Sequence, residues 1–335
     1  TSVALVGFNR YREDAEAAFK YIIYGVIGGL FFLVSVVLIY FNLGTLNMSL
    51  IADGFSKINN NMQFTIFFLF ITSLFIKIGI FPFHYWLPKA HSVCPSTISA
   101  VLSGVLMKVY IYMFIRLFVI VFNFDFIADI SFDVFIIYLS IISSILGHVL
   151  ALQSNDIKRM LAFSTIGNIG LILAAMALNT EMGLVGGLFH VVSHLLLKST
   201  IFISVGYLMQ FTEGHHITDF FGVAYNNRGI YFVFVISAMG LVGIPPLPGF
   251  FSKYYILQAF IEKGNYFIAA IIILLSIVAL FYYLRYIYSG YNLLDKKNGK
   301  TVKKGPVLSV FYREKTVVNV TYIFCLLVVF SGCFF

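Results

Sequence analysis

The chain has 335 residues, of which 60% are hydrophobic and 11% charged, and its mean hydropathy is +0.95. Soluble domains are close to half apolar and a quarter charged, so this composition excludes a soluble globular protein and predicts a membrane protein that crosses the bilayer several times. The formal net charge is +8, but the basic residues lie between the apolar segments, which argues against nucleic acid as a partner.

About nine apolar segments are long enough to cross the bilayer, because a hydrocarbon core of about 30 Å requires roughly 20 residues of helix. The predicted spans are residues 17–41, 63–83, 96–122, 131–152, 157–178, 183–210, 229–262, 265–290 and 316–335. The seventh is too long for one span and contains the sequence GIPPLPGF, so we expect two half-helices that meet near Pro245 and Pro248. A second broken helix is expected near Pro82.

The loops differ in charge between the two membrane faces. Only Lys57 and Lys263 are expected on the face opposite the start of the chain. The other loop cations lie on the face where the chain begins, here called the basic face: Arg10, Arg12, Lys89, Lys158, Arg159, Arg228 and the lysine-rich segment 291–315. By the positive-inside rule the basic face is the cytoplasmic or matrix face, which places the N-terminus inside and the C-terminus outside.

Residues 70–116 combine lysines in apolar runs with a proline-interrupted connection. The segment reads K-x-x-x-x-PFH-x-WLP-x-AH-x-x-x-PS-x-x-SA from Lys77, and K-V-Y-x-Y-x-x-x-R follows from Lys108. This pattern resembles the antiporter-like subunits of respiratory complex I, which are relatives of multi-subunit cation/proton antiporters and membrane-bound hydrogenases. The resemblance implies an all-α membrane bundle in which the nine spans match the sixth to fourteenth of the family's fourteen helices.

The resemblance also implies a division of the chain. Residues 1–122 would be the remainder of a first antiporter-like repeat, 123–290 a second, inverted repeat, 291–315 a basic matrix-side loop and 316–335 the C-terminal transmembrane helix. The opening EAAFKY and the segment GIPPLPGFFSKYYIL resemble subunit 2 of mitochondrial NADH dehydrogenase, whereas HVVSHLLLKSTIFIS resembles the subunit 5 branch and the antiporters. The first five helices would then belong to a separate chain, as when the gene is split in some protists.

Lys77 and Lys108 lie inside predicted spans. A lysine near the bilayer centre costs about 3 kcal/mol on insertion scales, so such a residue indicates function. The alternative is a side chain that extends to the membrane interface. The resemblance implies that Lys77 is the central switching lysine, that Lys108 passes the proton onward, and that a glutamate of the missing helices biases the charge of Lys77.

His190, His194 and Lys198 recur at every fourth position of the sixth span. On a helix this spacing places them on one stripe over about 12 Å of the axis. We interpret the stripe as a proton relay, because histidine passes protons through either ring nitrogen. A stripe of interhelical hydrogen bonds is the alternative. The set is a poor metal site, since no carboxylate or cysteine completes it.

Two further titratable residues lie next to the breaks. Lys253 follows the second break, where the resemblance implies the exit of the proton path; a lysine at the membrane edge is the alternative. His84 is seven residues from Lys77 and would share its face if the helix continued past Pro82. It either accepts protons from Lys77 or caps the broken helix.

These features predict a non-redox, proton-translocating subunit of NADH:ubiquinone oxidoreductase. No catalytic, nucleotide, metal or redox-cofactor motif is recognisable, so FMN, iron–sulfur clusters and ubiquinone are expected in other subunits. The expected location is the mitochondrial inner membrane, and the expected partners are other membrane subunits of complex I and lipids such as cardiolipin. The alternatives are a cation/proton antiporter or hydrogenase subunit, and a structural subunit that does not pump.

Overall fold

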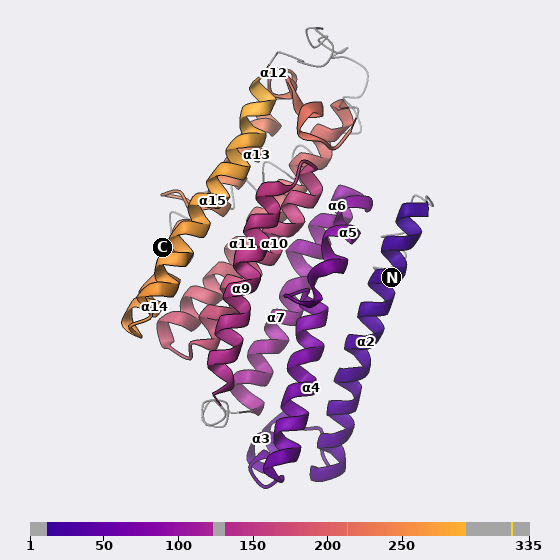
Figure 1. The fold of residues 1–335 in the computed structure, drawn as a ribbon, viewed down its shortest axis with the longest axis vertical. Coiled ribbons are helices and arrows are strands. Elements are labelled where there is room, and N and C mark those ends of the chain that lie inside the picture. Colours follow the sequence, from indigo (N-terminus) through magenta and orange to yellow (C-terminus); the bar gives the residue numbers. More distant parts are fainter. Residues whose placement is uncertain (1–11, 123–130, 213, 293–322, 324–335) are drawn as a thin grey trace.

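The computed structural model describes residues 12–122, 131–212, 214–292 and 323. The described part of the chain is a bundle of long helices that run in alternating directions, with α2 at one edge and α14 and α15 at the other (Figure 1). The α-helices are, in chain order, α2 (Arg12–Leu43), α3 (Met48–Phe55), α4 (Asn60–Ile78), α5 (Trp86–Val93), α6 (Ser96–Val101), α7 (Met107–Ile115), α9 (Phe132–Gln153), α10 (Ile157–Ala177), α11 (Glu181–Leu208), α12 (Val223–Asn226), α13 (Arg228–Val242), α14 (Pro248–Glu262) and α15 (Tyr266–Tyr291).

Five short turns complete the described elements. They are the 3₁₀ turns η1 (Phe83–Tyr85), η4 (Met209–Phe211) and η5 (Ile217–Phe220) and the π-helical turns η2 (Leu102–Leu106) and η3 (Arg116–Val121). The two π-helical turns flank α7, so the predicted span 96–122 is one apolar path of α6, η2, α7 and η3 rather than a regular α-helix. A π-helical turn shifts the register of the helix by one residue, and such turns are frequent at functional sites.

The predicted spans agree with the helices that the structure describes. Seven helical stretches are long and apolar enough to cross a membrane, and α13 is a shorter apolar helix. Together with α14 they account for the first eight predicted spans, which confirms an all-α protein that crosses the membrane several times. The ninth span, 316–335, and most of the basic segment 291–315 lie outside the described residues. The division into two repeats stays a prediction.

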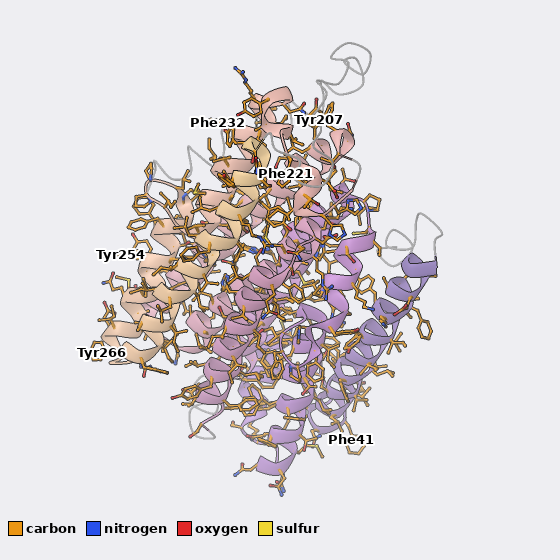
Figure 2. The ribbon with its side chains drawn as sticks, turned by 45° about the horizontal axis from the view of Figure 1, so that its top comes forward. Phe41, Tyr207, Phe221, Phe232, Tyr254 and Tyr266 are labelled. Carbon is orange, nitrogen blue, oxygen red and sulfur yellow. The ribbon has the colours of Figure 1, made fainter. Side chains whose placement is uncertain are left out.

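The outer surface of the bundle is apolar, as a lipid-facing surface requires. Phe41, Phe232, Tyr254 and Tyr266 are each more than half exposed, and Figure 2 places all four at the periphery. Large exposed apolar patches on a soluble protein would mark binding sites or cause aggregation. In a bilayer the same side chains contact hydrocarbon.

The first broken helix lies at the predicted place. α4 ends at Ile78, and Gly79 adopts a left-handed conformation (φ 73°) that turns the chain. The indole nitrogen of Trp86 donates to the carbonyl of Ile76 at 3.0 Å, and so ties the second half of the helix to the end of the first. The chain stays helical through α5, so this apolar path extends from Asn60 to Val93 and is longer than the predicted span 63–83.

The second broken helix is also confirmed. α13 ends at Val242, where Gly243 has a left-handed conformation (φ 93°), and α14 begins with Pro248 at its first turn. Proline suits this position because its missing N–H would have no partner inside the helix. The carbonyls at the end of α13 have lost their helical partners and need other donors.

The centre of the bundle is α10, which is buried along its whole length except at Arg159. Its N-terminus is capped by the Asp156 carboxylate, which accepts from the backbone N–H of Arg159 at 2.8 Å. α9 packs against it through glycines: a β-carbon at Gly147 would lie 2.8 Å from the α-carbon of Gly167 and 2.9 Å from the carbonyl oxygen of Phe163. Small residues of this kind let membrane helices approach closely.

We expect Gly147→Val to destabilise the assembled protein strongly. The added carbons meet backbone atoms that cannot rotate away, and overpacking of this kind typically costs about 1–3 kcal/mol. The measurement is the thermal midpoint and the yield in detergent. The matched control is Gly25→Val in α2, where a β-carbon meets nothing within 4 Å. Equal stability of the two variants would contradict the close approach of α9 and α10.

Candidate functional site

Lys108 lies at the start of α7, directly after η2, and only 7% of it is exposed. Its ammonium donates to the carbonyl of Ser103 at 2.6 Å and contacts Nδ1 of His194, also at 2.6 Å. An ammonium can only donate, so Nδ1 of His194 accepts and the neutral ring carries its proton on Nε2. Nε2 of His194 is buried and has no protein partner among the described residues. A proton taken up at Nδ1 can therefore leave from Nε2.

His190 lies one turn before His194 on α11, and the two ring centroids are 6.2 Å apart. The Asn168 side chain donates to the carbonyl of Ser164 at 2.7 Å, which turns its Oδ1 toward Nε2 of His190 at 3.2 Å. Nε2 of His190 therefore carries a proton in the neutral ring. The other nitrogen, Nδ1, lies 2.8 Å from the hydroxyl of Ser252 in α14.

The Ser252 hydroxyl can serve both protonation states of His190. Its oxygen lies 2.8 Å from Nδ1 of His190 and 3.1 Å from the carbonyl of Gly249, and it has one proton to donate. With His190 neutral, Ser252 donates to Nδ1. With His190 protonated, Nδ1 donates to Ser252, whose own proton turns to Gly249. Rotation of the Ser252 hydroxyl is therefore enough to keep His190 hydrogen-bonded when it becomes an imidazolium.

Lys253 follows Ser252 in α14 and is 6% exposed. Its ammonium donates to the carbonyls of Leu241 at 3.0 Å and Val242 at 2.9 Å, and to the hydroxyl of Ser276 at 3.2 Å. The two carbonyls belong to the last turn of α13, so the lysine caps the half-helix that the break leaves open. The alternative of a lysine at the exposed membrane edge does not fit this burial.

Lys198 is fully buried and makes no hydrogen bond to either histidine. Its ammonium donates to the carbonyl of Leu161 at 2.8 Å and to the hydroxyl of Ser164, both on α10. It also lies 6.0 Å from the centroid of the Phe202 ring. His190 and His194 therefore lie side by side as the spacing predicts, whereas the hydrogen bonds of Lys198 go to Leu161 and Ser164 of α10.

Lys77 is in the last turn of α4 and only partly buried. Its ammonium lies 5.5 Å from the centroid of the Phe32 ring and 5.6 Å from that of Tyr110. It lines a cavity of about 280 Å³ together with Tyr21, Tyr24, Gly25, Trp86 and Tyr110. Within the described chain, no carboxylate pairs with Lys77, Lys108, Lys198 or Lys253.

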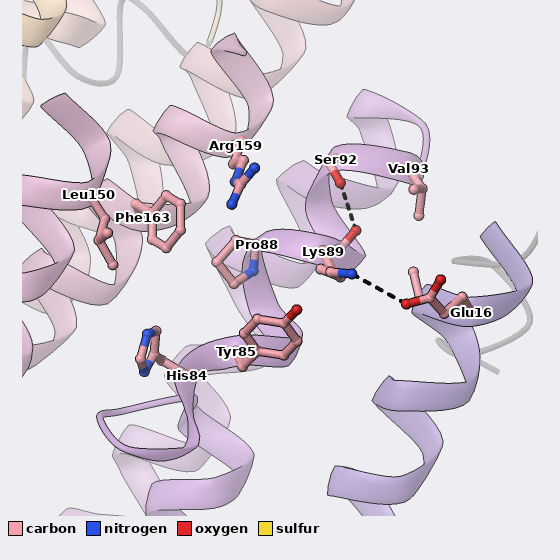
Figure 3. Close-up of a pocket in the computed structure, with 11 residues that line it drawn as sticks. Glu16, His84, Tyr85, Pro88, Lys89, Ser92, Val93, Leu150, Arg159 and Phe163 are labelled. Carbon is pink, nitrogen blue, oxygen red and sulfur yellow. Dashed lines mark hydrogen bonds and ion pairs between the residues drawn. The ribbon is translucent and has the colours of Figure 1, made fainter. Parts of the chain in front are cut away.

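His84 is not on the same face as Lys77, because α4 ends at Ile78 and does not continue past Pro82. It lines a separate cavity of about 450 Å³ near the basic face, shown in Figure 3. The cavity is also lined by Glu16, Tyr85, Lys89, Leu150, Arg159 and Phe163. Glu16 pairs with Lys20 in α2 and also with Lys89 at 3.3 Å.

Comparisons with known proteins identify the family. The sequence profile described as NADH:quinone oxidoreductase/Mrp antiporter, transmembrane, matches residues 1–279. The chain belongs to this family. It is 30% identical over 289 residues to NADH-quinone oxidoreductase subunit N of Desulforudis audaxviator, which covers 86% of this chain and 57% of that protein. It is 29% identical over 281 residues to a subunit of the Na(+)/H(+) antiporter of Alkalihalophilus pseudofirmus, which covers 84% of this chain and 56% of that protein.

A solved structure of the same fold comes from an archaeal respiratory complex. A chain of the membrane-bound sulfane sulfur reductase superposes with a TM-score of 0.85 at 29% identity, over 99% of this chain and 66% of that one. The chain thus spans less than two thirds of the length of the relatives that it matches. Together these matches confirm the resemblance to the antiporter-like family and do not distinguish the mitochondrial subunit 2 branch.

Several polar groups of the site could not be singled out from the spacing of lysines and histidines alone. They are Ser252, which bonds His190; Asn168, which orients it; and Ser164, Tyr282, Tyr283 and His148, which surround Lys198. A signal was present for two of them, because Asn168 and His148 are strongly polar residues inside the mainly apolar predicted spans 157–178 and 131–152. In the described part of the chain, no cluster of three or more histidines, cysteines or carboxylates could hold a metal ion.

We expect Asn168→Leu to impair whatever proton transfer passes through His190. The variant keeps the side-chain volume but leaves the Nε2 proton of His190 without an acceptor, and an unsatisfied buried donor costs about 1–3 kcal/mol. The neutral tautomer that accepts at Nδ1 is then no longer fixed. The measurement is the rate of proton translocation in membrane vesicles, for which we expect a loss of several-fold. An unchanged rate would show that the tautomer of His190 is immaterial.

Proposed function

We propose that the chain is a proton-translocating membrane-arm subunit of an NADH:quinone oxidoreductase. The observation that carries the proposal is the direct contact of the buried ammonium of Lys108 with His194, next to His190 and Ser252 on the way to Lys253. Buried cations in a membrane indicate function by default, because insertion disfavours them. The similarity to a quinone oxidoreductase subunit supports the same reaction class.

In the proposed transfer, the Lys108 ammonium gives a proton to Nδ1 of His194, and the proton on Nε2 leaves toward His190. A separation of 6.2 Å between ring centroids is of the size that one ordered water can bridge. His190 passes the proton through the Ser252 hydroxyl toward Lys253. Lys253 first releases its own proton at the broken helix, and its neutral amine then takes up the proton that arrives from Ser252. His84, in its cavity at the basic face, is a candidate for proton uptake.

Lys77 is proposed to receive its electrostatic partner from another segment of the family fold. Its ammonium faces aromatic rings and a cavity, and a carboxylate in that cavity would favour its charged state. We propose that this carboxylate belongs to a separate chain with the first five helices, within a mitochondrial complex whose matrix side is the basic face. We also propose that other subunits bind the redox cofactors and quinone, and that anionic lipids such as cardiolipin bind at the basic face.

A second candidate function is cation/proton antiport, favoured by the similarity to an Na(+)/H(+) antiporter subunit. The two are separated in vesicles that contain the assembled complex. The proposal predicts acidification driven by NADH and quinone and abolished by Lys77→Met. Transport that follows an imposed sodium gradient without an electron donor would identify an antiporter. A proton yield per electron unchanged by Lys77→Met would identify a structural subunit.

The proposal of a separate partner chain has its own test. Proteins that co-purify with the complex are identified by mass spectrometry, and a hydrophobic protein of about five spans with a carboxylate near the middle of its last helix is expected. If the mass of the native chain already includes those five helices, the separate partner chain is ruled out and the proposed proton translocation is unaffected.

A further inference from the structure

A second set of buried polar groups surrounds Lys198. It comprises Ser164 of α10, Tyr282 and Tyr283 of α15 and His148 of α9. Ser164, Lys198 and both tyrosines have no exposed surface, and His148 is 3% exposed. The groups come from four helices that are far apart in sequence. They meet only because α10 is enclosed by the other three.

Hydrogen bonds and one contact between neighbouring tyrosine rings join these groups into one path. The Lys198 ammonium donates to the Ser164 hydroxyl, whose oxygen lies 3.3 Å from the hydroxyl of Tyr283. The Tyr282 ring lies beside that of Tyr283, with ring centroids 4.6 Å apart, and the path requires a proton to pass between their two hydroxyls. At the far end, the same Tyr282 hydroxyl lies 3.2 Å from Nδ1 of His148. Every interior member is a hydroxyl, which can donate and accept at once.

The packing of α9 against α10 leaves space for the ring of His148, the last group of the path. The His148 ring lies directly over Gly167: a β-carbon there would be 2.8 Å from Cδ2 and 2.9 Å from Nε2 of the ring. Phenylalanine at 282 and 283 and leucine at 148 would fill similar volumes without the cost of burying polar atoms. Interhelical hydrogen bonds in membranes contribute only about 0.6 kcal/mol on average. Stability alone therefore gives little reason for these residues.

The path is also correctly composed for proton transfer. Lys198 loses a proton to the oxygen of Ser164 as Ser164 passes its own proton to the Tyr283 hydroxyl. Tyr283 passes its proton to Tyr282, and the proton of the Tyr282 hydroxyl moves to Nδ1 of His148. The hydroxyls end unchanged in charge, the ammonium becomes an amine, and the imidazole becomes an imidazolium. The Ser164 hydroxyl also has the carbonyl of Leu161 as an acceptor at 2.9 Å, so it rotates away from that carbonyl before it donates to a tyrosine.

His148, at the end of the path opposite Lys198, lies closer to the basic face than Lys198 does. His148 is five residues before Gln153, the last residue of α9, which is about 8 Å along the helix. Lys198 is ten residues before Leu208, the last residue of α11, which is about 15 Å. Both helices end at the basic face. The path thus rises toward that face from the level of Lys198.

We propose that Ser164, Tyr283 and Tyr282 conduct protons between Lys198 and His148, and that His148 is a second proton-holding site on the basic-face side of the bundle. The inference rests on the proposed function. It gives Lys198 a proton connection to His148 that does not pass through His190 or His194. It also places a group of α9, which carries none of the lysines and histidines of the proposed transfer, in the transport reaction.

The test uses vesicles that contain the whole complex, with proton translocation and electron transfer measured together. Tyr282→Phe removes one hydroxyl and keeps the ring, and we expect it to lower the protons moved per electron at least threefold. His148→Asn keeps a hydrogen-bonding group near the position of Nδ1 but cannot become a cation, and the same loss is expected. The double variant should lose no more than either single variant, because both interrupt one path. The control is Tyr286→Phe, a buried hydroxyl of the same helix that bonds the carbonyl of Ser154 at 3.5 Å.

Each outcome decides the inference. A normal proton yield in Tyr282→Phe and His148→Asn, with Lys108→Met inactive in the same preparation, overturns the branch and leaves the proposed function standing. A normal yield in Lys108→Met as well overturns both. If Tyr282→Phe fails to assemble, the proton yields of His148→Asn and Tyr283→Phe are used instead: a loss supports the branch and a normal yield overturns it. A full yield in His148→Asn would show that His148 is only a hydrogen-bond anchor.

Discussion

Replacement of Lys108 by methionine is expected to lower proton translocation at least tenfold while the complex still assembles. Methionine has a similar length and suits an apolar environment, so packing around α7 changes little. The loss is that of the ammonium, which contacts Nδ1 of His194 at 2.6 Å. Without it, His194 has no donor from which to take a proton. The measurement is the initial rate of acidification in vesicles, with Lys57→Met, at an exposed lysine, as the control.

A second substitution at the same position separates proton transfer from charge. Lys108→Arg keeps a cation and its hydrogen bonds, but guanidinium does not release its proton in proteins. We therefore expect Lys108→Arg to translocate as poorly as Lys108→Met. Normal translocation by Lys108→Arg would show that a fixed positive charge is sufficient, and the account of Lys108 as a proton donor would be wrong.

The second large effect is expected for Lys253→Met, which should impair both transport and stability. The ammonium is the donor for the last carbonyls of α13, those of Leu241 and Val242. A buried acceptor left without a donor costs about 1–3 kcal/mol. We expect at least a tenfold loss of translocation, and a larger fall in the thermal midpoint than in Lys108→Met. Both are measured on the purified complex.

The controls for this variant lie on the same two helices. Ser276→Ala removes only the weakest contact of the ammonium, at 3.2 Å, and is expected to change translocation less than twofold. Lys263→Met removes an exposed lysine just beyond α14 and should change neither property. If Lys253→Met kept full transport and lost only stability, the lysine would be a helix cap and the exit of the path would have to lie elsewhere.

The course of the helices could be predicted from the sequence because the bilayer imposes simple rules. Apolar runs of about 20 residues mark the spans, and proline with glycine marks the breaks near Pro82 and Pro245. The extension of the first broken helix to Val93 could not be predicted, since residues 84–93 are mixed in polarity. The central position of α10 could not be predicted either, because a helix that faces lipid and a helix that is enclosed by protein are both apolar on all sides.

The site could be predicted in part for the same kind of reason. Spacing on one helix is enough to place His190 beside His194, because the distance is set by α-helical geometry. It does not determine which neighbour a long side chain reaches, so Lys198 faces α10 although it shares the stripe. His84 would share a face with Lys77 only on a continuous helix, and Gly79 ends that helix. Tyr282 and Tyr283 gave no signal, since tyrosine is common throughout this chain.

The claim on which the account depends is that the buried cations are joined by groups or waters that can carry a proton. The direct measurement is an experimental map of the complex at a resolution that shows ordered water. The account predicts a water at Nε2 of His194 on the side of His190, and a hydrated connection from Ser252 to Lys253. Apolar side chains packed against Nε2 of His194, with no water between the histidines and Lys253, would contradict it.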